Sequence, residues 1–300
     1  MPAKDLRSIE IALRLRDDAY AQFRDTALDV LHEGYTRERG RALRSSFAAA
    51  PLAIGSLFGK FALRKVLAVM PNWLSMAVGM PNLGTVKFGD LGGTKPIGEV
   101  FGGNRGKCID RYYIENYLAE NADCIRGRVL EIEDNTYTLR FGGAAVAKSD
   151  VLHLYEGYPG ATIFGDMTDP KTLPENAFDC IVFTQTLHII YDMKAALRAL
   201  YRTLKPGGTL LLTVPGITPV DPGGWNDAWC WSLTESAARR LIAEEFGAAN
   251  VTCKTYGNVF AAVCFLVGLA TEEVPKAKLD VYDKAFPLVT GVRAVKPAVL

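Results

Sequence analysis

From about residue 106 onward, short apolar runs alternate with stretches of helical periodicity, and this alternation constrains the fold more than any other feature. The apolar runs predict strands at residues 128–132, 150–155, 161–165, 178–184, 209–214 and 250–257. Residues 112–123, 193–204 and 233–247 have helical patterns, residues 259–274 have room for another helix, and residues 287–297 are β-rich. This order predicts a doubly wound, mostly parallel α/β sheet with helices on both faces.

The part of the chain before residue 105 has a different pattern. Residues 5–44 are charged and helix-prone, with apolar side chains at helical spacing. Residues 71–106 are rich in proline and glycine, which favours extended loops. We therefore predict a helical N-terminal extension with a loop-rich linker over 1–104, followed by one α/β domain over 105–300.

Composition limits the possible partners. The chain has 34 basic and 33 acidic residues and a net charge of +1, which argues against charge-driven binding of nucleic acid. Its six cysteines lack metal-ligand spacing, and no secretory signal is recognisable, so we expect no metal site, reduced thiols and a cytoplasmic protein.

The apolar residues 51–70 are interrupted by Lys60, Arg64 and Lys65, so we expect no integral membrane span. This segment could pack on the domain or contact a membrane surface as a basic amphipathic helix. Nothing indicates an oligomeric state.

Four blocks follow one another in a specific order: "GRVLEIEDNTYT", "FGDMTD", "FDCIVFTQTLHII" and "ALRALYRTLKPGGTLLLTVPG". Together they resemble the class I S-adenosylmethionine-dependent methyltransferases, from about residue 105 to the C-terminus. The pair "GKCIDRYYIENYL" and "VLEIEDNTYTLRFG" resembles a bacterial, type 11-like subgroup of that family. The resemblance implies a Rossmann-like domain, S-adenosyl-L-methionine as cofactor and methyl transfer as activity.

The turn after the first strand departs from the family pattern, because it has no glycine. The acid at Glu131 is retained, but Glu133, Asn135 and Tyr137 replace residues that are usually glycine. Glycine there accepts a positive φ and admits the ligand, and asparagine tolerates this conformation best among the replacements. We therefore expect Asn135 to be left-handed. A glycine-free acidic turn disfavours binding of the pyrophosphate of NAD, and so argues against an NAD-linked dehydrogenase, whereas it suits a cationic cofactor. The alternative is that "EDNT" is only a helix cap.

The resemblance also implies specific cofactor contacts. Glu156 would hold the ribose hydroxyls, Asp166 would accept the adenine amino group, and Met167 would cover the adenine ring. Glu131, Glu133 and Asn135 would line the first turn, Thr184 and Gln185 the methyl-donor pocket, and Tyr113 the methionine moiety. The alternatives are a surface turn for Glu156, a turn cap for Asp166 and core packing for Tyr113.

Other residues are expected on the acceptor side. His188 could remove a proton from a hydroxyl during transfer, or only donate a hydrogen bond. Trp225 and Trp229 lie in a long loop that could cover a substrate ring or simply pack down. We expect methyl transfer to an oxygen of a small molecule, a sugar or a secondary metabolite. A cofactor-binding scaffold, and an enzyme for a non-methylating rearrangement or cyclisation, are the alternatives.

Overall fold

The structure is a computed structural model that describes residues 85–298. The chain divides into two compact units between Gly92 and Gly93, and all elements discussed below belong to the second unit. The helices expected over 5–44 and the apolar stretch 51–70 lie outside the described residues. The domain division at 104/105 therefore stays a prediction.

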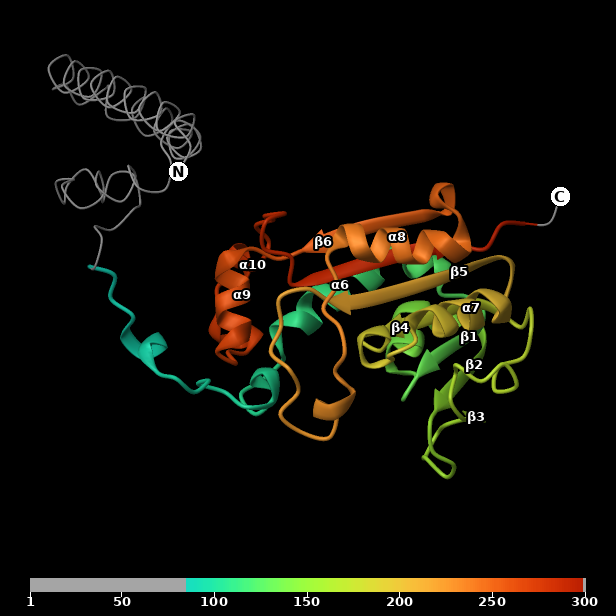
Figure 1. Cartoon of the computed structure of the whole chain (residues 1–300), viewed down its shortest axis with the longest axis horizontal. Coiled ribbons are helices and arrows are strands. Elements are labelled where there is room, and N and C mark those ends of the chain that lie inside the picture. The colour runs from blue at the N-terminus through green and yellow to red at the C-terminus, as the bar shows by residue number, and fades with distance from the viewer. Residues whose placement is uncertain (1–84, 299–300) are drawn as a thin grey trace, which may run out of the picture. The chain divides into compact units, whose positions relative to one another are not determined.

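The described part of the chain forms one seven-stranded sheet with the strand order β3-β2-β1-β4-β5-β7-β6 (Figure 1). All neighbouring pairs are parallel except those made by β7, which runs antiparallel to both β5 and β6. Strand order reverses between β1 and β4. The strands are β1 (Gly127–Ile132), β2 (Val146–His153), β3 (Ile163–Phe164), β4 (Phe178–Thr184), β5 (Leu204–Pro215), β6 (Val251–Tyr256) and β7 (Val289–Val295).

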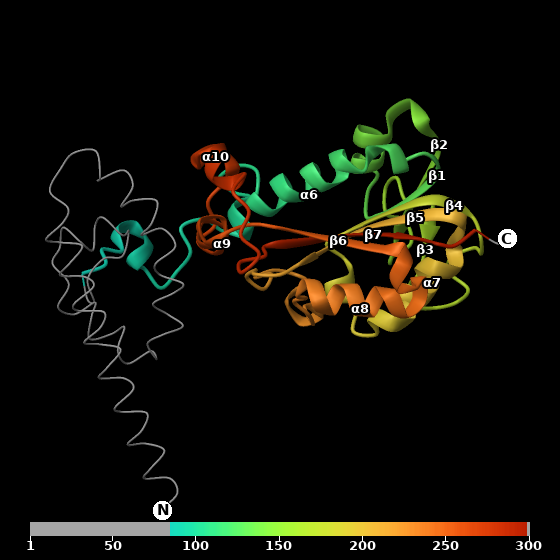
Figure 2. The ribbon, with the colours of Figure 1, turned by 90° about the horizontal axis from the view of Figure 1, so that it is seen from above.

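Helices cover both faces of this sheet. The helices are α6 (Ile109–Glu120), α7 (Met193–Thr203), α8 (Glu235–Phe246), α9 (Val259–Leu266) and α10 (Lys276–Leu279). Figure 2 shows α7 and α8 on one side of the sheet and α6 on the other, with α9 and α10 near the end of the sheet where α6 begins. Alternate residues of β4 point to the two sides: Ile181 and Phe183 pack with α7 and α8, whereas Cys180 and Val182 pack with α6 and α9. The predicted doubly wound, Rossmann-like fold class is confirmed.

Local sequence signals explain where several helices begin. Asp192 caps α7 by accepting a hydrogen bond from the backbone N of Ala195, at 2.9 Å. Thr234 and Asn258 make the equivalent bonds at the starts of α8 and α9. Each cap satisfies a backbone donor that the first helical turn leaves free.

Two predicted element boundaries need correction. Residues 205–208 lie between the predicted helix at 193–204 and the predicted strand at 209–214, but β5 already begins at Leu204 and includes them. The pairing register with β4 shifts here, between Phe178 and Cys180, so the strand absorbs the Pro-Gly-Gly sequence as an irregularity. β2 also begins at Val146, four residues before the predicted start at Asp150.

Candidate functional site

The candidate site lies at the carboxyl ends of β1 and β4, because ligands of doubly wound sheets bind where strand order reverses. Around this point lie the N-terminus of α6, a short helical segment after β1 (Thr138–Gly142) and a turn after β4 (Leu187–Ile189). The long segment 216–234 between β5 and α8 lies at the end of the sheet to which β5 points (Figure 1).

Glu131 anchors the turn after β1. Its side chain is only 3% exposed, and its two carboxylate oxygens accept hydrogen bonds from the backbone N of Tyr137 at 3.2 Å and of Thr138 at 2.7 Å. Burial raises the pKa of Glu131 to about 7, against the opposing effect of these hydrogen bonds. Glu131 therefore ties the helical segment to the strand, and both its oxygens already have partners.

The left-handed residue in this turn is Glu133 and not Asn135, so that expectation was wrong. Glu133 has a φ of 71°, whereas Asn135 is not among the residues with positive φ. The backbone N of Glu133 donates to the carbonyl of Leu152 on β2 at 3.0 Å, so the chain must turn directly after the strand. Asn135 instead donates from Nδ2 to Ser149 Oγ at 3.2 Å. Asp134 Oδ1 accepts from the backbone N of Thr136 at 2.8 Å, within the turn that leads to the helical segment.

The predicted ribose and adenine residues lie in the loops that follow β2 and β3. Glu156 is exposed and, among residues 85–298, has no hydrogen-bond or ion-pair partner. Asp166 is exposed as well, and its Oδ1 accepts from the backbone N and the hydroxyl of Thr168. Met167 is 6% exposed and packs within the core cluster of the α7 and α8 side.

A second left-handed residue follows β4. Gln185 has a φ of 46°, and its backbone N donates to the carbonyl of Thr213 on β5 at 3.0 Å. Its side-chain Nε2 is buried and has no hydrogen-bond partner. Thr184 is the last residue of β4, and its carbonyl accepts from Thr186 Oγ1 at 2.9 Å. The strand end is therefore rigid, while one amide donor stays available to a ligand.

His188 lies in the same turn after β4 and is more deeply buried than Gln185. The residue is 2% exposed, and neither ring nitrogen has a hydrogen-bond partner. Its backbone carbonyl accepts from the backbone N of Cys230 and of Trp231, both at 3.1 Å, which fixes the long loop against the turn after β4. Burial, assisted by the charge of Arg111, lowers the pKa of His188 to about 4. The ring is therefore neutral at pH 7, with one donor and one acceptor nitrogen free for a ligand.

The two tryptophans predicted for the acceptor pocket differ in position. The ring of Trp229 lies edge-on to His188, with centroids 4.3 Å apart and an interplanar angle of 63°. It also stacks on Phe101 at 5.9 Å, and its Nε1 is buried without a partner. Trp225 is 48% exposed and is held by its backbone N, which donates to Asp221 Oδ2 at 2.9 Å. Of the two, Trp229 is the residue that the fold brings to His188.

Tyr113 packs in the core, which was the alternative reading of this residue. Its hydroxyl donates to the carbonyl of Leu279 at 2.9 Å, and its ring contacts Tyr112 and Tyr256. Arg111, two residues earlier, is the residue of this helix that lies within electrostatic reach of His188 and Tyr137. Neither Arg111 nor Tyr137 was assigned a role at the site from the sequence. Residues two apart on a helix are separated by a rotation of about 200° and so point to nearly opposite sides. Because Tyr113 belongs to the apolar face of the helix, Arg111 could have been expected on the other side.

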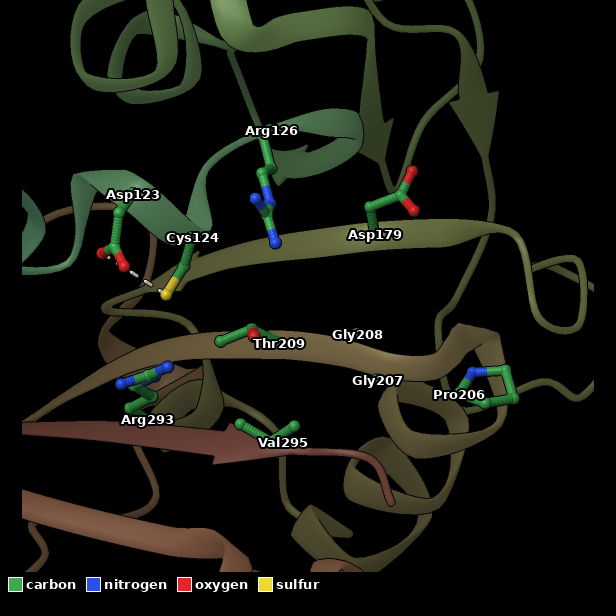
Figure 3. Close-up of a pocket in the computed structure, with 10 residues that line it drawn as sticks. All are labelled: Asp123, Cys124, Arg126, Asp179, Pro206, Gly207, Gly208, Thr209, Arg293 and Val295. Carbon is green, nitrogen blue, oxygen red and sulfur yellow. Dashed lines mark hydrogen bonds between the residues drawn. The ribbon is translucent and has the colours of Figure 1, made fainter. Parts of the chain in front are cut away.

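Two cavities in the described part of the chain lie elsewhere. One, of about 340 Å³, is at the opposite edge of the sheet, where β1 and β4 begin, and includes Arg126, Asp179 and Arg293 (Figure 3). The other, of about 680 Å³, lies between α6, β6 and the segment after α10. Neither contains Gln185, His188 or Trp229. The candidate site is defined by its buried unpaired polar atoms.

Comparison with known proteins points to the same region of the chain. Residues 116–212, from within α6 to within β5, match the family model described as "Methyltransferase domain". A ubiquinone/menaquinone biosynthesis C-methyltransferase of Enterobacter sp. (strain 638) is 51% identical over 39 residues, which are 13% of this chain and 16% of that protein. The chain thus spans about a sixth of the length of the curated relatives it matches.

Solved structures with similar folds are distant in sequence. A SAM-dependent methyltransferase from Archaeoglobus fulgidus is 13% identical, with a TM-score of 0.43, over 62% of this chain and 94% of that one. A phosphoethanolamine N-methyltransferase 2 from Haemonchus contortus, in complex with S-adenosyl-L-methionine, is 14% identical, with a TM-score of 0.41, over 61% and 52%.

Proposed function

Because the chain contains a class I S-adenosylmethionine-dependent methyltransferase domain, we propose that it transfers the methyl group of S-adenosyl-L-methionine to an oxygen of a small molecule, such as a sugar or a secondary metabolite. One observation carries the proposal: His188, Gln185 and Trp229 present buried, unpaired nitrogens where strand order reverses. Buried polar groups in native proteins almost always have hydrogen-bond partners, so a bound ligand is the simplest source of the partners missing here.

The residues present at this edge of the sheet fit the proposed cofactor. The carboxylates of Glu133 and Glu156 have no partner among residues 85–298, and no hydrogen bond involves Asp166 Oδ2 there. Carboxylates accept hydrogen bonds from hydroxyls and amines and attract cations. S-adenosyl-L-methionine offers a ribose diol, an adenine amine, an ammonium and a sulfonium. Glu156 would hold the diol, Asp166 the adenine amine, and Glu133 would face the cationic end.

The chemistry asks little of the protein beyond positioning. The bound cofactor supplies a methyl group that its sulfonium already activates for displacement. Trp229 and Gln185 would orient the acceptor, and the loop fixed to His188 would exclude water. The neutral ring of His188 can take the proton from the acceptor hydroxyl. With a pKa of about 4 it is a weak base at rest, so positioning carries most of the work.

The first test is binding. Calorimetry should detect S-adenosyl-L-methionine and its demethylated product at concentrations up to about a millimolar, the weak end of specific affinities. If neither compound binds at that concentration, the proposal is overturned.

The second test is the role of His188. His188→Gln keeps a polar side chain and should leave cofactor affinity unchanged while lowering methyl transfer by roughly 10²–10⁴-fold, the usual contribution of a general base. Transfer is measured with isotopically labelled cofactor against a panel of hydroxylated acceptors. An unchanged rate in His188→Gln would leave His188 a purely positional role.

A cofactor-binding scaffold without methyl transfer is the second candidate, motivated by the absence of glycine from the turn after β1. Labelled cofactor that binds but never transfers its methyl group to any acceptor of the panel would favour this scaffold. The cytoplasmic location, the absence of nucleic-acid binding and the contact of residues 51–70 with a membrane stay predictions. Over residues 85–298, none of the helices has both the length and the apolar character needed to cross a membrane.

A further inference from the structure

The cavity of about 340 Å³ at the edge where β1 and β4 begin contains two arginines without a carboxylate partner (Figure 3). Arg126 lies directly before β1 and Arg293 lies on β7, so the sheet brings them together from distant parts of the chain. Among residues 85–298, no carboxylate lies within ion-pair distance of either guanidinium, and neither guanidinium makes a hydrogen bond. Both residues are exposed, so a dissolved ligand can reach them.

The two acidic side chains of this cavity do not neutralise the arginines. Asp179 Oδ2 accepts from Lys205 Nζ and from the backbone N of Arg128, both at 2.8 Å, so its carboxylate already has partners. Asp123 makes one weak contact there, in which its Oδ1 accepts from the thiol of Cys124 at 3.7 Å. Because Lys205 offsets Asp179, the two arginines face a single uncompensated carboxylate. The cavity therefore has an excess of positive charge and of hydrogen-bond donors.

The walls of the cavity leave room for a small polar ligand. Its volume is at the lower end of the range of small-molecule sites, about 300–1,000 Å³. Gly207 forms part of the wall with a φ of 80°, and nothing lies within 4 Å of the position that a Cβ would take there. Thr209 adds a hydroxyl group. None of the described residues that line the cavity is aromatic, so a planar ring would find no stacking partner.

We propose that this cavity binds the phosphate group of a small molecule between Arg126 and Arg293. Two cations from different elements suit a group that presents oxygens in several directions and carries up to two negative charges. A phosphate has both properties, whereas a carboxylate has one charge and a single plane of oxygens. Free phosphate or a phosphomonoester could supply the group. The site lies at the opposite edge of the sheet from His188, so the inference does not depend on the proposed function.

The test compares Arg126→Gln and Arg293→Gln with Arg240→Gln in the full chain. Arg240 is an exposed residue of α8 that does not line the cavity and has no ion pair among the described residues, so it controls for the loss of one arginine. Arg293→Lys keeps the charge and replaces Arg293→Gln if that variant does not fold. The probes are inorganic phosphate, glycerol 3-phosphate and a single-stranded RNA oligonucleotide. Binding is measured by calorimetry and phosphorus NMR at constant ionic strength, because salt screens exposed charges.

The wild type should bind at least one of the two small phosphates with a dissociation constant of roughly a few millimolar or lower. Arg126→Gln and Arg293→Gln should each weaken this binding by at least about tenfold, Arg293→Lys should keep part of it, and Arg240→Gln should behave as wild type. Asp123→Asn removes the opposing charge and should strengthen it. Tighter binding of glycerol 3-phosphate than of inorganic phosphate would identify the ligand as a phosphomonoester, and equal or weaker binding would identify it as free phosphate.

Three results would overturn the proposal. The first is that neither small phosphate binds to the wild type at concentrations up to about 10 mM, whether or not the RNA oligonucleotide binds. The second is that both Arg126→Gln and Arg293→Gln bind the phosphates as the wild type does. The third is that S-adenosylhomocysteine displaces the phosphate, because the phosphate would then occupy the candidate site at the other edge of the sheet.

Discussion

Glu133 and Gln185 have left-handed backbones directly beyond the carboxyl ends of two paired strands, with φ of 71° after β1 and 46° after β4. Each non-glycine residue in this region costs of the order of 1 kcal/mol or more. Residues under such strain cluster at functional sites, where the backbone must bend sharply to admit a ligand. Their shared position supports the assignment of the candidate site.

Glu133→Gly should stabilise the protein. Glycine adopts a φ of 71° without steric cost, which stabilises the folded state. Glycine also gives the unfolded chain more conformational freedom, which offsets part of this gain, so the free energy of unfolding should rise by about 0.5–1 kcal/mol. Asn135→Gly is the comparison variant: its φ is not positive, so the same entropy, together with loss of the Nδ2 bond to Ser149, should lower the free energy of unfolding by about 1 kcal/mol or more. Urea unfolding measures both. The reverse order of the two variants would show that the turn bends at Asn135 instead.

His188 should make stability depend on pH below neutrality. Its folded pKa of about 4 is below the unfolded value of about 6.5, so the unfolded state binds more protons between these values. The contribution of the neutral ring is complete above pH 6.5 and is lost as pH falls toward 4. Relative to His188→Gln, the wild type should lose about 2 kcal/mol between pH 7 and pH 5, measured by urea unfolding. Parallel curves for the two proteins would contradict a buried neutral histidine.

Glu131 should have the opposite effect at higher pH. Its folded pKa of about 7 is above the ordinary value, so its contribution to stability is complete below pH 4.5 and is lost as pH rises through 7. Glu131→Gln removes this titration, so unfolding free energy should decline less between pH 5 and pH 8, by up to about 3 kcal/mol. The variant should be less stable than wild type at pH 5, because an amide offers one acceptor oxygen for two backbone amides. An identical decline in both proteins would mean that Glu131 is already ionised at pH 5.

Glu156→Ala and Asp166→Ala should each weaken S-adenosylhomocysteine by about 1.5–3 kcal/mol, the scale of a lost charge-assisted hydrogen bond. Asp166 also holds a turn through Thr168, at 2.8 Å from the backbone N and 2.7 Å from the hydroxyl. Thr168→Val removes the hydroxyl bond and keeps the carboxylate, so it measures the turn alone by calorimetry. Unchanged affinity in both alanine variants would mean that the cofactor pocket is elsewhere.

The sequence alone determined the fold class and most of its elements. β4 spans the seven predicted residues, Phe178–Thr184, because the apolar run over 180–183, bounded by Asp179 and Thr184, favours a buried strand. α7 ends at Thr203, one residue before its predicted end, because Pro206 cannot continue a helix. These features depend on neighbours in the chain, and so does the order of motifs that identified the methyltransferase domain.

Only the tertiary structure decided how the site is assembled. Arg111 and Tyr113 are two residues apart on α6, and the packing of Tyr113 against Leu279 and Tyr256, far along the chain, determines which of them reaches His188. Glu133 bends instead of Asn135 because a carbonyl of β2 captures its backbone N. The antiparallel insertion of β7 between β5 and β6 is likewise a pairing of distant segments. Periodicity and turn chemistry report local preferences, whereas these choices depend on contacts that exist only once the sheet has formed.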